Sequence, residues 1–213
     1  STADASIWHR RLGHIYRDNI NRLAQMVDGV VAQAAQLHYV MLATSVGTSV
    51  DLLQGGYQAI YPGDQIHMDL IDTQIGYNSH RYCCHFLDDA TRVQFAYTLE
   101  SRKQEVMVHC IQIFCNMMEN EFNRRPKVFK TDGERALGQA FTEYCKSKGI
   151  IMEVSVPHTP NQNSTAERTS HMIIEKARTM MIDSQLPKTL WPEAYKAATY
   201  LINRTPTYTP IRH

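Results

Sequence analysis

The chain has 213 residues, a hydrophobic fraction of 43%, a charged fraction of 20% and a formal net charge of +1. These values are typical of a globular protein with one medium-sized domain, and they exclude a strongly basic nucleic-acid coat protein. No apolar run reaches the length of a membrane span, and five cysteines without a Cys-x-x-Cys pair argue against a disulfide framework and a thiolate zinc site.

Residues 1–42 are predicted to form a small, mainly helical N-terminal segment. It contains His9 and His14, which could supply half of a zinc site. The stretch that follows offers only His38 and Asp51 as further ligands. These residue types therefore argue against a closed zinc site.

A linker rich in Thr, Ser and Gly is predicted over residues 43–64. After it, three short apolar runs joined by polar turns predict an antiparallel meander. Ser101 and Gln104 have the spacing of a capping box, which predicts that a long amphipathic helix begins at Ser101. The next strand is reached through that helix, so we expect it to run parallel to a strand of the meander. The predicted strands are 66–71, 81–87, 93–99, 127–131 and 150–156, and the predicted helices are 101–122, 137–145, 166–182 and 190–203.

This order of elements predicts an α/β fold with a mixed five-stranded sheet flanked by helices. Asp69 lies within the first strand, Asp132 follows the fourth strand, and Glu167 lies in the first turn of the helix after the last strand. If the first and fourth strands are parallel neighbours, the two aspartates approach each other and Glu167 joins them from the helix.

Three convergent carboxylates repel one another unless a cation neutralises them, and oxygen ligands suit Mg²⁺ or Mn²⁺. Two such ions about 4 Å apart would activate an attacking oxygen and stabilise a leaving oxygen in phosphoryl transfer. The pattern therefore indicates metal-dependent phosphodiester chemistry on nucleic acid. The alternative, that these carboxylates have no catalytic role, stays open. Acidic residues are common at strand ends, and the helix dipole stabilises a glutamate in a first turn. For Asp88 and Asp89, a tight turn explains the sequence better than a ligand role.

Several motifs, collinear over almost the whole chain, resemble the integrase of copia-type long-terminal-repeat retrotransposons and, more distantly, the retroviral integrases. The motifs are Trp8-His-Arg-Arg-Leu-Gly-His14, His67-Met-Asp-Leu70, Phe86-Leu-Asp-Asp-Ala-Thr-Arg92, Lys130-Thr-Asp-Gly-Glu134, His158-Thr-Pro-Asn-Gln-Asn-Ser-Thr-Ala-Glu-Arg168, Leu190-Trp-Pro-Glu-Ala194 and Tyr200-Leu-Ile-Asn-Arg-Thr-Pro206. The resemblance implies a ribonuclease-H-like catalytic core over residues 65–206, with residues 207–213 as a tail. It also implies a catalytic and metal-binding triad of Asp69, Asp132 and Glu167.

The same resemblance implies a function. The enzyme would trim the 3′ ends of element DNA and transfer them into host DNA, using two Mg²⁺ or Mn²⁺ ions. It would act as a homo-multimer in the nucleus, after synthesis as part of a polyprotein, with helices 107–122 and 190–202 available for the multimer interface. DNA contacts would come from His158, Asn161, Asn163, Arg168 and His171, for which loop solvation and an ordinary helix surface remain the alternative.

Three departures from the family pattern bear on activity. The GAG-pre-integrase type of N-terminal segment pairs its two histidines with a Cys-x-x-Cys, but residues 37–41 hold no cysteine, so His9 and His14 would be vestigial zinc ligands. His158 replaces the usual tyrosine of the loop, and Ser164 replaces a glycine whose backbone freedom serine lacks. These changes also suit an inactive or domesticated integrase core that serves as a DNA- or protein-binding module. A ribonuclease H shares the chemistry, but the Pro-Asn-Gln-Asn loop argues against it.

Overall fold

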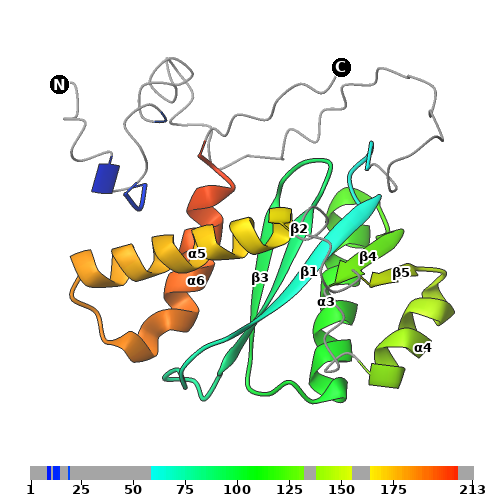
Figure 1. Ribbon diagram of the computed structural model, residues 1–213, viewed down its shortest axis with the longest axis horizontal. Coiled ribbons are helices and arrows are strands. Elements are labelled where there is room, and N and C mark those ends of the chain that lie inside the picture. Colours follow the sequence, from blue (N-terminus) through cyan, green and yellow to red (C-terminus); the bar gives the residue numbers. More distant parts are fainter. Residues whose placement is uncertain are drawn as a thin grey trace.

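The computed structural model describes residues 9–10, 12–14, 19, 59–131, 138–154 and 164–205, with the backbone alone at 164–167. Its centre is a five-stranded sheet with the strand order β3-β2-β1-β4-β5 (Figure 1). The first three strands pair antiparallel, whereas β4 runs parallel to β1 and β5 runs parallel to β4. The predicted meander and the predicted parallel crossover are therefore both confirmed. The strands are β1 (Gln65–Asp72), β2 (Tyr82–Asp88), β3 (Gln94–Leu99), β4 (Val128–Thr131) and β5 (Ile151–Val154).

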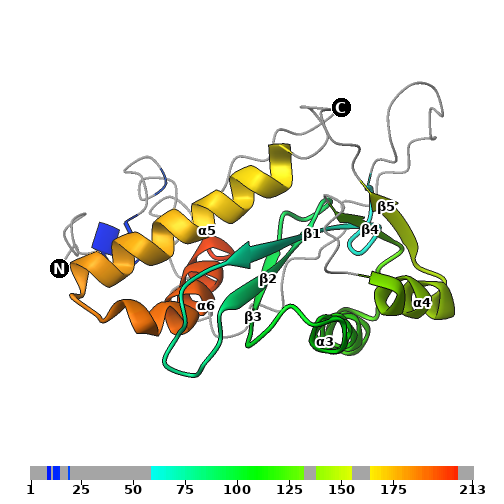
Figure 2. The ribbon, with the colours of Figure 1, turned by 60° about the horizontal axis from the view of Figure 1, so that its bottom comes forward.

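Helices cover both faces of this sheet. The helices α3 and α4 lie on one face, and α5 and α6 lie on the other (Figures 1 and 2). None of the helices in the described ranges has both the length and the apolar character needed to cross a membrane. The helices are α3 (Gln104–Phe122), α4 (Gly138–Lys148), α5 (Ser164–Asp183) and α6 (Trp191–Ile202), with the 3-10 turn η3 (Lys188–Leu190) before α6.

Strand β1 separates two different environments, because successive side chains of a strand point to opposite faces. Ile66 and Met68 belong to the apolar core under α3 and α4, where the rings of Phe86 and Phe114 stack with centroids 4.2 Å apart. Asp69 lies on the opposite face, under α5. That second face is apolar around Ile173, Trp191 and Ala198 of α5 and α6, and polar along the first half of β1.

The predicted capping box at Ser101 is wrong. Helix α3 begins at Gln104, and its N-cap residue, Lys103, makes no side-chain capping bond. The side chain of Gln104 lies at the start of α4 instead, where its Oε1 accepts a hydrogen bond of 3.5 Å from the backbone N–H of Ala140. A Cβ at Gly138 would collide with this side chain. A tertiary contact has thus taken the residue that the local motif would have used.

The end of the predicted linker packs on the sheet. Gly63 donates a 2.6 Å hydrogen bond to Oδ2 of the buried Asp88, and Asp64 forms a 2.7 Å ion pair with Lys127. The other oxygen of Asp88 accepts hydrogen bonds from the backbone and the hydroxyl of Thr91, so the tight-turn interpretation of Asp88 is confirmed. Residues 43–58 and 206–213 lie outside the described residues, and the domain boundaries there stay predictions.

The loop between β1 and β2 packs against the start of α6. The indole N–H of Trp191, at the start of α6, donates a 2.7 Å hydrogen bond to the carbonyl of Gln74. Gly76 is buried in the same loop, and a Cβ at this position would lie 2.7 Å from Cγ of Pro192. The fit between loop and helix therefore depends on a missing side chain at position 76.

We expect Gly76→Ala to lower the free energy of unfolding by about 1–3 kcal/mol, the usual cost of overpacking a close contact. Urea unfolding followed by tryptophan fluorescence measures this loss. In a Pro192→Ala background the same substitution should cost less, because the clashing ring is gone. An equal cost in both backgrounds would show that the Pro192 contact is not the reason.

Candidate active site

The candidate site is centred on Asp69 in the middle of β1. Its carboxylate is half-buried, and Oδ2 accepts a hydrogen bond of 2.6 Å from the hydroxyl of Ser170 on α5. A hydroxyl that donates to a carboxylate makes a short, charge-assisted bond, and this distance falls in that range. The contact joins the central strand directly to the helix that covers it.

The parallel pair β1–β4 brings two further sequence positions into the same region. In the last pair of its register, His67 lies beside Lys130. Asp69 follows His67 by two residues, and Asp132 follows Lys130 by two residues. Position 167 of α5 lies three residues before Ser170, on the same side of the helix and one turn earlier. Asp132 and the side chain of Glu167 lie outside what the structure describes, as do His158, Asn161 and Asn163.

His85 is a buried neighbour that the sequence patterns did not single out. It stands directly opposite Asp69 in the β1–β2 register, and its Nδ1 lies 3.1 Å from Oγ of Ser170. Burial lowers the pKa of His85 to about 4; the neighbouring Gln94 side chain opposes this shift, and the nearby His67 adds to it. The ring is therefore neutral near neutral pH. A signal was available in the sequence, since His85 is the one basic side chain within the apolar run of β2.

The polar character of this face continues toward the start of β1. The Nε2 atom of His67 lies 3.3 Å from Oδ1 of Asp89, which also forms a 2.9 Å ion pair with Arg92. Both His67 and Gln65 are buried. The strand thus carries a row of buried polar groups that leads to Asp69.

The two residues predicted to contact DNA from α5 are on the surface. Arg168 and His171 are both exposed and lie three positions apart, so they share one side of the helix. They follow the position of Glu167 within about one turn. The geometry makes them accessible, and their role stays a prediction.

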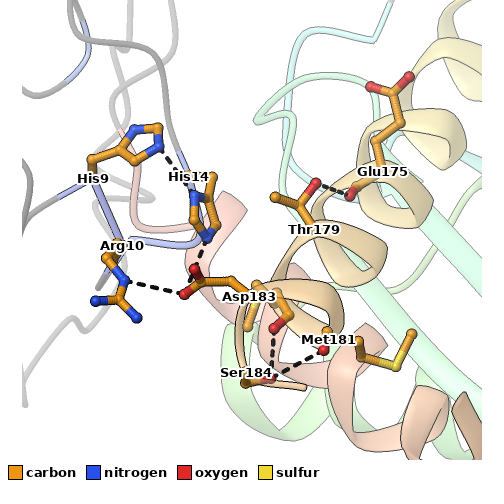
Figure 3. Close-up of polar contacts among 9 residues, drawn as sticks. His9, Arg10, His14, Glu175, Thr179, Met181, Asp183 and Ser184 are labelled. Carbon is orange, nitrogen blue, oxygen red and sulfur yellow. Dashed lines mark hydrogen bonds and ion pairs between the residues drawn. The ribbon is translucent and has the colours of Figure 1, made fainter. Parts of the chain in front are cut away.

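The N-terminal histidines pack against the far end of α5 (Figure 3). His14 Nδ1 lies 3.0 Å from His9 Nε2, and the other ring nitrogen of His14 lies 3.6 Å from Asp183. Arg10 donates a 3.1 Å hydrogen bond to the same carboxylate oxygen. Gly13, with φ +65°, fits closely against side chains of α5 and α6. This short segment is therefore in contact with the core, and the interpretation of His9 and His14 as vestigial zinc ligands stays a prediction.

Within the described ranges, no three His, Cys, Asp or Glu side chains are close enough together to hold a metal ion. Within the predicted acidic triad, Asp69 is the one residue whose side chain is described. Ser170 binds one of its oxygens as a neutral donor, which leaves the negative charge and the second oxygen for a cation. An oxygen ligand of this kind fits Mg²⁺ or Mn²⁺.

The chain is similar in sequence to known proteins. Residues 61–160 match the family described as "Integrase core domain". The chain is 32% identical to the Retrovirus-related Pol polyprotein from transposon TNT 1-94 of Nicotiana tabacum, over 94% of this chain and 15% of that protein. It is also 32% identical to the corresponding polyprotein from transposon RE1 of Arabidopsis thaliana, over 97% of this chain and 14% of that protein. The chain thus spans about one seventh of these relatives.

Solved structures agree on the fold. The HTLV-2 integrase catalytic core domain in complex with magnesium aligns with a TM-score of 0.54 and 17% identity, over 70% of this chain and 90% of that one. The simian T-cell lymphotropic virus intasome in complex with a PP2A regulatory subunit aligns with a TM-score of 0.59 and 18% identity, over 73% of this chain and 54% of that one. The predicted ribonuclease-H-like fold is confirmed.

We expect the free energy of unfolding to fall as the pH is lowered from about 6.5 toward 4. Over that interval the unfolded chain protonates His85, whose ordinary pKa is 6.5, whereas the folded chain, in which this pKa is about 4, does not. The stability that the neutral ring provides is present above the unfolded pKa and is lost below it, by up to about 3 kcal/mol.

Urea unfolding at several pH values measures this loss, with His85→Asn as the control. The variant cannot titrate at this position, so its stability should fall less steeply over the same interval. Because the buried Asp88, whose pKa is raised by burial, is common to both proteins, its contribution cancels in the comparison. Parallel pH profiles for the two proteins would contradict the prediction.

Proposed function

Since this chain carries an integrase core domain of the kind found in retrotransposon Pol polyproteins, we propose that it is a polynucleotidyl transferase that cuts and joins DNA. The observation that carries the proposal is the hydrogen bond between Ser170 and Asp69. It ties the strand that bears the first predicted carboxylate to the helix that bears the third, Glu167. A metal site shared by the three carboxylates would need this strand and this helix to lie together.

In the proposed reaction, Asp69, Asp132 and Glu167 would hold Mg²⁺ or Mn²⁺. Such an ion, when bound, would neutralise charge on the phosphate and activate the attacking oxygen. In 3′-end processing a water oxygen forms the new bond to phosphorus, and in strand transfer a DNA 3′-hydroxyl does so. In both steps the 3′-oxygen of the cleaved strand leaves.

Two features support this triad. The parallel register of β1 and β4 has the same offset in sequence as Asp69 and Asp132, because His67 pairs with Lys130. The helical spacing puts position 167 on the side of α5 that faces β1, one turn before Ser170. Each carboxylate would then come from a different element of the same sheet-and-helix layer.

We further propose that element and host DNA bind along the start of α5, with contacts from Arg168 and His171 and from His158, Asn161 and Asn163 of the preceding loop. A homo-multimer and a nuclear site of action follow from the same assignment. Exposed apolar side chains on the helices predicted for the interface, Ile113 on α3 and Tyr200 on α6, are compatible with subunit contacts.

A resolution assay on branched DNA that mimics the strand-transfer product tests the reaction. We expect the chain to resolve this DNA with Mn²⁺ or Mg²⁺. Glu167→Gln should reduce the rate at least about 100-fold. Loss of a residue that only hydrogen-bonds to a metal ligand typically reduces metal affinity or activity about 10- to 100-fold, and loss of a ligand itself should cost more. Asp72→Asn is the control, since Asp72 is an exposed carboxylate on β1, the strand of Asp69, and is paired with Arg81. It should keep the wild-type rate.

Failure of the folded wild-type chain to resolve the DNA would favour the alternative, a catalytically inactive or domesticated core that binds DNA or protein. Manganese titration also distinguishes an active transferase from an inactive binding core. A working site should bind Mn²⁺ more tightly in the wild type than in Asp132→Asn. Equal affinity in both would count against the proposed triad.

The DNA contact of Arg168 has its own test. Arg168→Ala should weaken binding to all DNA sequences similarly, and it should reduce the slope of log affinity against log salt by about 1. Filter binding or fluorescence anisotropy at several salt concentrations measures both effects. Arg178→Ala is the control, because Arg178 is exposed on the same helix ten residues further on. Equal effects of the two substitutions would contradict a localised contact.

A further inference from the structure

We propose that His85 and Ser170 are positioning residues for the candidate active site, with His85 acting through the Ser170 hydroxyl to orient the carboxylate of Asp69. This inference rests on the proposed function of that site. The three side chains come from three elements, β2, α5 and β1, and form one continuous chain of hydrogen bonds. Neither His85 nor Ser170 belongs to the acidic triad.

The direction of each hydrogen bond follows from the chemistry of the groups. An ionised carboxylate can only accept, so the Ser170 hydroxyl donates to Asp69 over the 2.6 Å contact. The serine hydrogen is then used, and Oγ can act toward His85 only as an acceptor. His85 must therefore carry its hydrogen on Nδ1, the atom 3.1 Å from Oγ.

The imidazole ring is held firmly enough to serve as an anchor. His85 lies in the middle of β2, between β1 and β3, and is 1% exposed. Its Nε2 and the Oε1 atom of Gln94 are both buried without a hydrogen-bond partner. If the Gln94 amide is turned over, its NH₂ group faces the ring and donates to Nε2, which satisfies that nitrogen in the same tautomer. The backbone of Gln94 is itself fixed by two hydrogen bonds with Asn203.

The consequence for Asp69 is a preferred carboxylate orientation. Oδ2 accepts a hydrogen bond from Ser170, which is itself held by His85, and Oδ1 is the oxygen left for a cation. Partners of this kind orient metal ligands, and their loss typically costs about 10- to 100-fold in metal affinity. A neutral imidazole and a hydroxyl achieve this without adding a positive charge that would compete with the metal, which agrees with the low pKa of His85.

Shape-matched substitutions test the role of each residue through Mn²⁺ affinity. Ser170→Val should bind Mn²⁺ about 10-fold more weakly than wild type, whereas Ser170→Thr, which has the same shape but keeps a hydroxyl, should stay within about threefold. His85→Gln should weaken binding, whereas His85→Asn should largely restore it, because its amide nitrogen can take the place of Nδ1. Thermal unfolding of all four variants checks that the fold is intact.

Two outcomes of the titration are distinguishable. If wild type binds Mn²⁺ and the valine and threonine variants bind it equally well, the positioning role is overturned while the proposed function stands. If folded wild type does not bind Mn²⁺, the proposed function fails, and the positioning role fails with it.

The tautomer of His85 gives a readout that is independent of metal and activity. Long-range proton–nitrogen NMR correlations on the metal-free chain should show a hydrogen on Nδ1 and none on Nε2. In Ser170→Val this preference should weaken, because the acceptor for Nδ1 is gone. A hydrogen on Nε2 in the wild-type protein would reverse the direction of the hydrogen bonds and overturn the inference.

Discussion

The two-residue alternation of β1 is the constraint on which the rest of the structure depends. Ile66 and Met68 enter the apolar core beneath α3 and α4, so the residues between them must face α5 and α6. A shift of the strand by one residue would exchange the two sets and bury Asp69 among phenylalanine rings. The stacked rings of Phe86 and Phe114 therefore help to determine the position of the Asp69 carboxylate, although both rings lie on the other face of the sheet.

The face under α5 and α6 contains buried polar groups that lower the stability of the fold. Gln65 and His67 are both buried there, and each has one side-chain atom without a hydrogen-bond partner among the described residues. Unsatisfied buried polar groups lower stability by about 1–3 kcal/mol each. A fold selected only for stability would fill this space with apolar side chains. The polar row ends at Asp69, which connects the cost to the proposed site.

Helix α5 joins features that are far apart in the sequence. Its first half brings Ser170 to Asp69, and its last turn presents Asp183 to Arg10 and His14 (Figure 3). These surface ion pairs contribute little stability by themselves, typically below about 1 kcal/mol. Together with the tight fit of Gly13, they nevertheless bring the N-terminal motif onto the same helix that covers the candidate site.

The sequence alone determined the order of the elements, the antiparallel meander, the parallel crossover and the acidic residues that motifs identify. Hydrophobic periodicity and turn residues act over a few positions, so they can be read along the chain. The sequence could not determine which side chains meet over long separations. Asp69 and Ser170 are 101 positions apart, and His85 and Ser170 are 85 apart. The same limit explains the failed capping box, because Gln104 bonds to Ala140 of another helix. Such contacts arise only when helices pack on a sheet, and packing decided which polar residues surround Asp69.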